Sequence, residues 1–134
     1  MAKKLLKPYE LLLFKGEEDL IASKYLLDGF NNHNLELKLD IIFFHMQQSL
    51  EKLIKCLLDL NGIKFPHIHD LDELIVLLND NNIIIHDMVH ELLPLSIFAV
   101  NGRYAIINDD LSDAEKYINI LDEILAFVKA EIEK

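Results

Sequence analysis

Four polar side chains in the middle of the chain recur at helical spacing. Gln48 precedes Glu51 and Lys52 by three and four residues, and Lys55 follows that pair by four and three. An α-helix would place all four side chains on one face. Such a row can hold an anionic ligand. Glu and Lys at this spacing are also typical of a solvated helix face, and the pattern alone favours that second interpretation.

Histidines offer a second type of chemistry, because imidazole gains and loses a proton near neutral pH. His69 stands directly before Asp70 in a predicted loop, and a functional His69 needs a partner from elsewhere in the fold. His86 and His90 are four residues apart, a spacing that can chelate zinc on an α-helix. No third ligand stands at a suitable spacing, so surface or half-buried histidines are favoured, and no metal or cofactor is predicted.

The chain contains one arginine, Arg103, beside twelve lysines. The planar guanidinium matches a phosphate or a carboxylate with two parallel hydrogen bonds, which an ammonium group cannot do. Arg103 is therefore a candidate for anion binding. A genome with a bias towards lysine codons would produce the same composition, so the composition leaves both explanations open.

The polar row belongs to a predicted long helix that runs from Leu39 and ends at Asn61-Gly62, a typical helix-terminating pair. No proline or glycine interrupts this stretch. Apolar residues follow it with the period of a helix that packs one face into a core. They are Ile42, Phe43, Met46, Leu50, Leu53, Ile54, Leu57 and Leu58.

Helical periodicity and capping signals predict four further helices. Their expected bounds are Tyr9 to about Phe30, about Leu71 to Leu78 after the cap Asp70, about Ile84 to Val100 with a bend or break at Pro94, and a last helix that Ser112 opens and that carries apolar residues to Ile132. Gly16, inside the first helix, marks either the close approach of a neighbouring helix or a mild defect. The expected fold is all-α: one domain, residues 1–134, forming an antiparallel up-and-down bundle of about five helices.

Composition narrows the classes of function. The chain has 134 residues, a net charge of −10 and one cysteine, Cys56. This charge argues against broad, sequence-independent binding of nucleic acid, which depends on neutralising phosphates. No apolar run reaches the roughly 18 residues that suggest a membrane span. A single cysteine on the apolar side of a helix is typical of a structural thiol in a reducing compartment, so a cytoplasmic protein is expected.

Three short segments, in order, resemble the motifs of the HEPN domain family. Residues 47–55, QQSLEKLIK, are similar to its Q-x-x-E-K-x-x-K signature. Residues 69–71, HDL, together with Leu74, resemble its H-D-L-x-x-L segment, and residues 103–104, RY, resemble its R-Y-P element. The order, the spacing and the expected helix positions agree over most of the chain.

The resemblance implies an all-α bundle that forms homodimers and that occurs beside minimal nucleotidyltransferase subunits, often in toxin–antitoxin pairs. Many HEPN proteins are metal-independent ribonucleases that use an R-x(4–6)-H motif. Here no histidine follows Arg103, and Ala105 replaces the proline of R-Y-P. The chain therefore resembles a variant that lacks the ribonuclease motif, and it is expected to be a non-catalytic binding module.

In this interpretation Lys52, Lys55 and Arg103 hold nucleotide or RNA phosphate, and Tyr104 stacks on a base. His69 or Gln48 hydrogen-bonds the base, while Glu51 orients a lysine. One alternative is a metal-independent ribonuclease toxin in which His69 serves with Arg103, because imidazole suits both proton transfers of RNA cleavage. Another alternative is a structural dimerisation domain in which the same residues form a polar network between helices.

Overall fold

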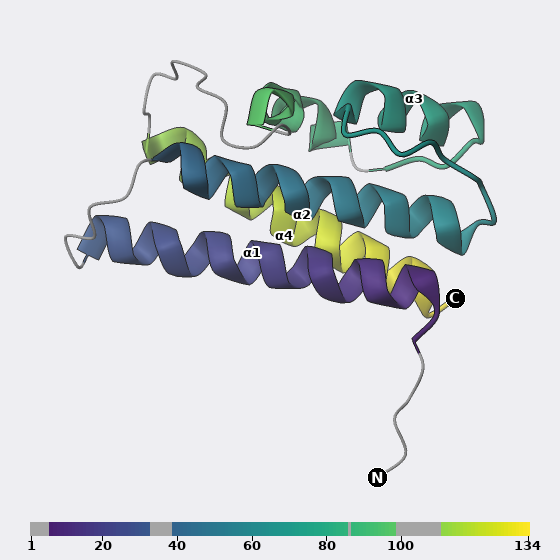
Figure 1. Cartoon of the computed structure of the whole chain (residues 1–134), viewed down its shortest axis with the longest axis horizontal. Helices are drawn as coiled ribbons and strands as arrows, with labels where there is room; N and C mark the ends of the chain where they lie inside the picture. The colour runs from purple at the N-terminus through teal and green to yellow at the C-terminus, as the bar shows by residue number, and fades with distance from the viewer. Residues whose placement is uncertain (1–5, 33–38, 86, 99–110) are drawn as a thin grey trace, which may run out of the picture.

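The computed structural model describes residues 6–32, 39–85, 87–98 and 111–134, and these residues form five helices and no strand. The all-α up-and-down bundle is thus confirmed (Figure 1). The predicted bounds agree within two residues for every helix except η1. The helices are α1 (Pro8–Asn32), α2 (Leu39–Leu60), α3 (Leu71–Asp80), the 3-10 helix η1 (Asp87–Phe98) and α4 (Leu111–Ile132).

Helix α2 is the centre of the bundle and contacts each of the other four helices. Figure 1 shows α1 running antiparallel along one side of α2, while α3 and η1 lie across its other side. Helix α4 runs antiparallel to α1, and two exposed ion pairs join the two helices: Lys24 to Asp122 and Lys129 to Glu17, both at 2.6 Å. None of the described helices is both long and apolar enough to cross a bilayer.

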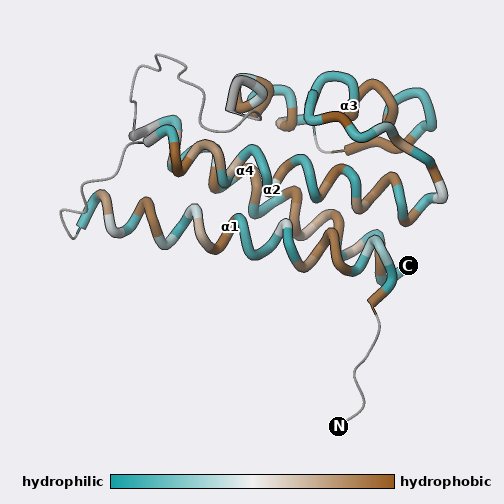
Figure 2. Tube along the Cα trace, in the orientation of Figure 1, coloured by the Kyte–Doolittle hydropathy of each residue, from teal (hydrophilic) through white to brown (hydrophobic). Residues whose placement is uncertain are grey.

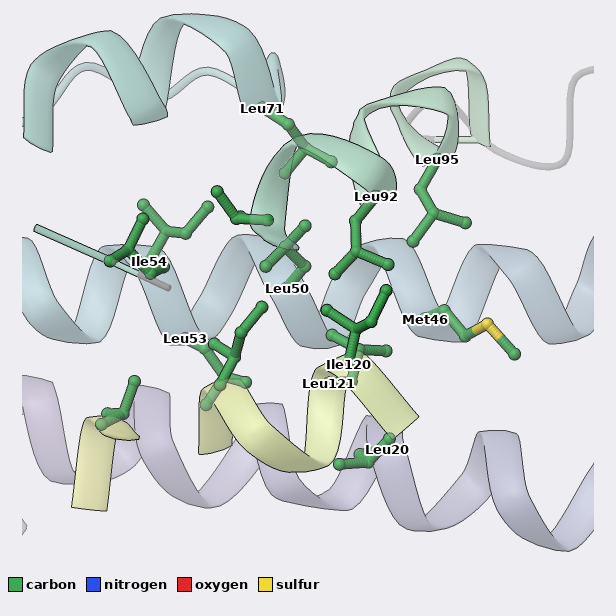
Figure 3. Packing of buried hydrophobic residues seen from close by; sticks show 14 of the residues in the cluster. Leu20, Met46, Leu50, Leu53, Ile54, Leu71, Leu92, Leu95, Ile120 and Leu121 are labelled. Carbon is green, nitrogen blue, oxygen red and sulfur yellow. The ribbon is translucent and has the colours of Figure 1, made fainter. Parts of the chain in front are cut away.

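The apolar stripe predicted on α2 forms the core, and each of its eight residues is at most 3% exposed. Figure 2 shows apolar and polar residues alternating along the helices. Each fully buried Leu or Ile stabilises the fold by about 1.5–3 kcal/mol. Figure 3 shows Met46, Leu50, Leu53 and Ile54 of α2 meeting Leu20 of α1, Leu71 of α3, Leu92 and Leu95 of η1, and Ile120 and Leu121 of α4.

Helix α2 ends at Leu60, directly before the predicted pair Asn61-Gly62, and Gly62 has a φ of +72°, which glycine adopts without steric cost. The Ile63 N–H donates to the Leu58 carbonyl at 2.9 Å, and the Gly62 N–H donates to the Asp59 carbonyl at 3.0 Å. These two bonds are those of a Schellman C-cap. The cap turns the chain back along α2 and so sets the path of residues 63–70, which carry His69.

Helix α3 begins at the predicted cap. One carboxylate oxygen of Asp70 accepts hydrogen bonds from the backbone N–H groups of Asp72, at 2.9 Å, and Glu73, at 3.5 Å. Removing such a cap typically costs about 1 kcal/mol. His69 therefore immediately precedes a capped helix start.

Helix α4 begins at Leu111, so Ser112 lies in its first turn rather than before it.

Gly16 marks the close approach of α1 and α2, which settles the two interpretations of this residue. A Cβ atom at Gly16 would lie 3.1 Å from Cδ2 of Leu53 and 3.4 Å from the backbone oxygen of Ser49. The Ser49 hydroxyl donates to the Gly16 carbonyl at 2.8 Å. The missing side chain therefore lets the two helices approach closely just beside the polar row.

The predicted α-helix from Ile84 to Val100 is wrong in type and in its start. Residues 83–85 are not helical, and residues 87–98 form a 3-10 helix; residues 99 and 100 lie outside the described part of the chain. Pro94 lacks an N–H and its ring clashes with the carbonyl four residues earlier in an α-helix, which disfavours that form here. Side chains four residues apart point about 40° from each other around the axis of an α-helix, but about 120° from each other around the axis of a 3-10 helix. Such side chains therefore do not share one face of η1.

Candidate functional site

The four residues of the polar row are not a solvated face, because none of them is exposed. They divide between two directions. Glu51 and Lys55 lie against the segment that leads into α3, whereas Lys52 pairs with a residue of α1. Gln48 lies between the two groups, and its amide nitrogen donates to the side-chain oxygen of Gln47 at 2.6 Å. One row on the sequence thus becomes two clusters in the fold.

The first group, here called the Glu51 cluster, consists of Gln47, Glu51, Lys55 and His69. The Glu51 side chain is only 5% exposed. Its carboxylate accepts hydrogen bonds from Nε2 of Gln47 at 3.0 Å and from Nζ of Lys55 at 3.1 Å. A buried carboxylate is tolerated only when it is paired and hydrogen-bonded, and Glu51 satisfies both conditions.

His69 is held by the same carboxylate. Its Nδ1 lies 3.1 Å from Oε1 and 3.2 Å from Oε2 of Glu51, and its backbone carbonyl faces the Gln47 amide at 3.4 Å. An ionised carboxylate only accepts hydrogen bonds, so this contact requires a proton on Nδ1. The imidazole is 60% exposed, and its Nε2 has no hydrogen-bond partner among the described residues. Glu51 therefore fixes the ring while Nε2 stays available.

Lys55 faces the interior. Its side chain is 11% exposed, and its ammonium group is ion-paired to Glu51 and lies 5.8 Å from the centre of the Phe65 ring. A cation over an aromatic face is favourable, especially where water is partly excluded. The sequence-based expectation that Glu51 orients a lysine agrees with this geometry. Lys55 is already neutralised, however, and offers little free charge to a ligand.

The second group, here called the Asp19 cluster, joins α1 to α2. Oδ2 of Asp19 lies 2.5 Å from Nζ of Lys52, and Oδ1 of Asp19 lies 3.1 Å from Nδ1 of His45. Asp19 and His45 were missed from sequence. The signal that could have found them is their position, because Asp19 on α1 and His45 on α2 both lie close to Gly16 or Ser49 along their helices. That signal can be used only when the pairing of α1 with α2 is known.

The charges of the two clusters cancel while both histidines are neutral. Asp19 and Glu51 supply two negative charges, and Lys52 and Lys55 supply two positive ones. Binding of phosphate here therefore needs further positive charge, from a protonated imidazole or from Arg103. Arg103 and Tyr104 lie outside the described residues, so their position relative to the clusters stays a prediction.

The histidine pair predicted as a possible metal chelate stays a prediction, because His86 lies outside the described residues. Its partner His90 is exposed on η1. Within the ranges that the structure describes, no group of three or more His, Cys, Asp or Glu side chains is placed to hold a metal ion.

Cys56 is unsuited to nucleophilic chemistry. Burial, assisted by the nearby negative charge of Asp59, raises the pKa of its thiol from 9.0 to about 11. The thiolate is the reactive form of cysteine, so the thiol stays protonated at neutral pH. This agrees with the interpretation of Cys56 as a structural residue of the core.

Comparisons with known proteins agree with this architecture. The family model for the HEPN domain matches residues 9–131. Among solved structures, the crystal structure of an archaeal HEPN homologue is similar, with a TM-score of 0.62 and 22% identity over 95% of this chain and 99% of that one. At this identity the likeness supports the fold alone. A search of curated proteins found no match.

Proposed function

The chain belongs to the HEPN family, and we propose that it is a non-catalytic module that binds a nucleotide or RNA and acts with a minimal nucleotidyltransferase partner. The observation that carries this proposal is His69, whose Nδ1 is fixed by the buried carboxylate of Glu51 while Nε2 remains exposed. A ring held in one orientation loses little conformational entropy when it binds a ligand.

The proposed site is built around this ring. Nε2 of His69 accepts a hydrogen bond from a base, or donates one to phosphate when the ring is protonated. Gln48 is half-buried, and its side-chain oxygen has no partner among the described residues, so it adds an acceptor. Arg103 supplies the charge that the clusters lack, and Tyr104 stacks on the base. Lys52 and Lys55 are ion-paired to Asp19 and Glu51, so they support the site by holding these carboxylates and add little charge of their own.

The ligand experiment measures binding and thermal stability together. Purified protein is titrated with nucleoside mono-, di- and triphosphates and with a labelled single-stranded RNA, and the melting temperature is recorded with each ligand. A ligand that binds the folded state raises the melting temperature. We expect His69→Ala and Arg103→Ala each to weaken binding by about tenfold, the effect of one lost hydrogen bond or charge contact.

Lys129→Ala is the matched control, because it removes one positive charge from α4, where Lys129 pairs with Glu17. It should leave ligand binding unchanged. If Lys52→Ala and Arg103→Ala lower the melting temperature while no nucleotide or RNA raises it, the polar clusters are only a structural network. In that case the domain is a dimerisation or scaffold unit, and the binding proposal fails.

The partner and the dimer are tested separately. We expect the gene next to this one to encode a small nucleotidyltransferase, and the two proteins to elute together after co-expression. We also expect the isolated chain to form a homodimer, which light scattering coupled to gel filtration measures directly. A monomer that binds no nucleotidyltransferase from its own genome would contradict this part of the proposal.

A ribonuclease is the second candidate, and the contact between Glu51 and His69 favours it. A carboxylate that orients an imidazole is a recurrent way to prepare a general base. His69 could take the proton of the RNA 2′-hydroxyl, and Arg103 could stabilise the charge that develops on phosphate. Cleavage of structured RNA in the presence of EDTA, abolished by Arg103→Ala and by His69→Ala, would establish this enzyme and overturn the non-catalytic module.

A further inference from the structure

A shallow apolar groove of about 350 Å³ lies between α3 and the segment that precedes it, and no residue of the two polar clusters lines it. Ile68, Val76 and Leu77 contribute to its apolar lining. Three carboxylates, Asp72, Glu73 and Asp80, surround that lining. Figure 1 shows α3 in the outer layer of the bundle, so the groove is on the surface.

Ile68 and Leu77 are partly buried and also pack against the core, so Val76 is the residue of the apolar lining that the fold itself does not use. Helix α3 is anchored through its opposite face, which buries Leu71, Leu74, Ile75 and Leu78 in the core. Val76, by contrast, is 54% exposed. A branched apolar side chain left open in a groove, rather than alone on a convex surface, is a typical feature of a binding site.

The acidic residues of the groove keep their charge unpaired within the described part of the chain. Asp72, Glu73 and Asp80 make no ion pair with any described residue. Asp72 and Glu73 occupy the first turn of α3, where the helix dipole favours negative charge. Asp80 lies in the last turn, where the dipole disfavours it, and that turn contains no basic residue. The dipole therefore explains two of the three carboxylates and leaves Asp80 unexplained.

We propose that this groove binds a basic amphipathic segment of a partner protein. One or two leucine-like or aromatic side chains of the partner would fill the space over Val76 and Leu77. Lysine or arginine side chains beside them would pair with Asp72, Glu73 and Asp80. A helix that places its apolar face into a groove and its charged residues on the rim is an established mode of peptide recognition. This inference does not depend on ligand binding at His69.

The charge of the groove selects this occupant. Three carboxylates, on a chain whose net charge is −10, repel phosphates and therefore nucleic acid. They attract cationic segments and accelerate their association, most strongly at low salt. Helix α3 is about 15 Å long, which matches roughly three turns of a bound helix and sets the scale of the recognised segment.

The test uses a fluorescein-labelled synthetic peptide of about fourteen residues, with leucines at helical spacing on one face and lysines elsewhere. A scrambled peptide of identical composition is the first control, because it keeps the charge and loses the apolar face. Fluorescence anisotropy on the full chain should show at least tenfold tighter binding of the amphipathic peptide. Equal binding of the two peptides, or no binding, would overturn the proposal.

Variants then locate the contact. Two variants should each weaken binding of the amphipathic peptide by at least tenfold. One is Val76→Asp, at an exposed position, and the other is the triple variant Asp72→Asn, Glu73→Gln, Asp80→Asn. The matched control neutralises three exposed carboxylates elsewhere, with Asp113→Asn and Glu115→Gln in α4 and Glu133→Gln just after it. This control should change binding by less than twofold. Equal loss in both triple variants would show attraction to overall charge and refute the groove. A wild-type dimer that Val76→Asp converts to monomer would identify a second copy as the occupant and also overturn the proposal.

Discussion

The two polar clusters beside α2 share a carboxylate, a lysine and a histidine, to which the Glu51 cluster adds the Gln47 amide, and they use these groups differently. In each, one carboxylate holds one lysine and one histidine: Asp19 holds Lys52 and His45, and Glu51 holds Lys55 and His69. The Asp19 carboxylate is 16% exposed and its histidine 33%, whereas Glu51 is 5% exposed and its histidine 60%. The Glu51 cluster thus has the more buried anion and the more exposed imidazole.

This difference separates a structural role from the proposed ligand-binding role. The Asp19 cluster links two long helices and exposes a third of its imidazole, so its groups mainly satisfy one another. The Glu51 cluster buries its charges beneath the segment before α3 and leaves most of the His69 ring exposed, with no described residue bonded to its Nε2. We therefore propose that the same set of charged groups fastens helices in one cluster and positions an imidazole for a ligand in the other.

Glu51→Ala should have the largest effect on stability. It leaves the Lys55 ammonium, 11% exposed, without its counter-charge, and removes acceptors from Gln47 and His69. Breaking a buried pair by removing one partner typically costs about 3–5 kcal/mol. Urea denaturation measures this loss. The double variant Glu51→Ala, Lys55→Met should recover much of it, since no unpaired charge then remains; a double variant as unstable as the single one would contradict the assignment of the loss to Lys55.

Asp19→Asn should cost less, about 1.5–3 kcal/mol, the range for hydrogen bonds to charged groups. Its partners Lys52 and His45 are partly exposed, so water can replace part of what they lose. Measured by the same denaturation, the ratio of the two losses tests the comparison. If Asp19→Asn destabilised the chain as much as Glu51→Ala, the two clusters would not differ in burial energetics.

Sequence periodicity predicted α2, its apolar stripe and its polar row, because all three depend on residues within a few turns of one helix. It did not predict that the row divides, since that depends on Asp19, located 33 residues before Lys52 and brought near only by the packing of α1. His69 was found through its motif, but its contact with Glu51 depends on the path that the Gly62 cap imposes. The 3-10 geometry of η1 was missed because Pro94 predicts a disturbed helix without specifying its form.

The third largest effect on stability is expected at Cys56, which lies on the apolar side of α2, one residue from Lys55. Its thiol pKa is raised to about 11 in the folded state, so above pH 9.0 the unfolded chain loses this proton first. The contribution of the thiol to stability is complete below pH 9.0 and is lost as pH rises towards 11. The wild type should lose about 1 kcal/mol more than Cys56→Val between pH 8 and pH 10. Identical pH profiles would show that burial does not hold the thiol protonated.

The two histidines give the smallest stability effect and the sharpest comparison. His69→Ala and His45→Ala each remove one contact to a carboxylate, and we expect each to lower stability by less than about 1 kcal/mol, as for partly exposed pairs. Only His69→Ala should also weaken nucleotide or RNA binding, because its ring is 60% exposed whereas that of His45 is 33% exposed. Denaturation and anisotropy on the same two proteins measure both quantities. Equal loss of binding in both variants would mean that the ligand contacts both clusters. Loss of binding in His45→Ala alone would mean that the Asp19 cluster binds the ligand and the Glu51 cluster is structural.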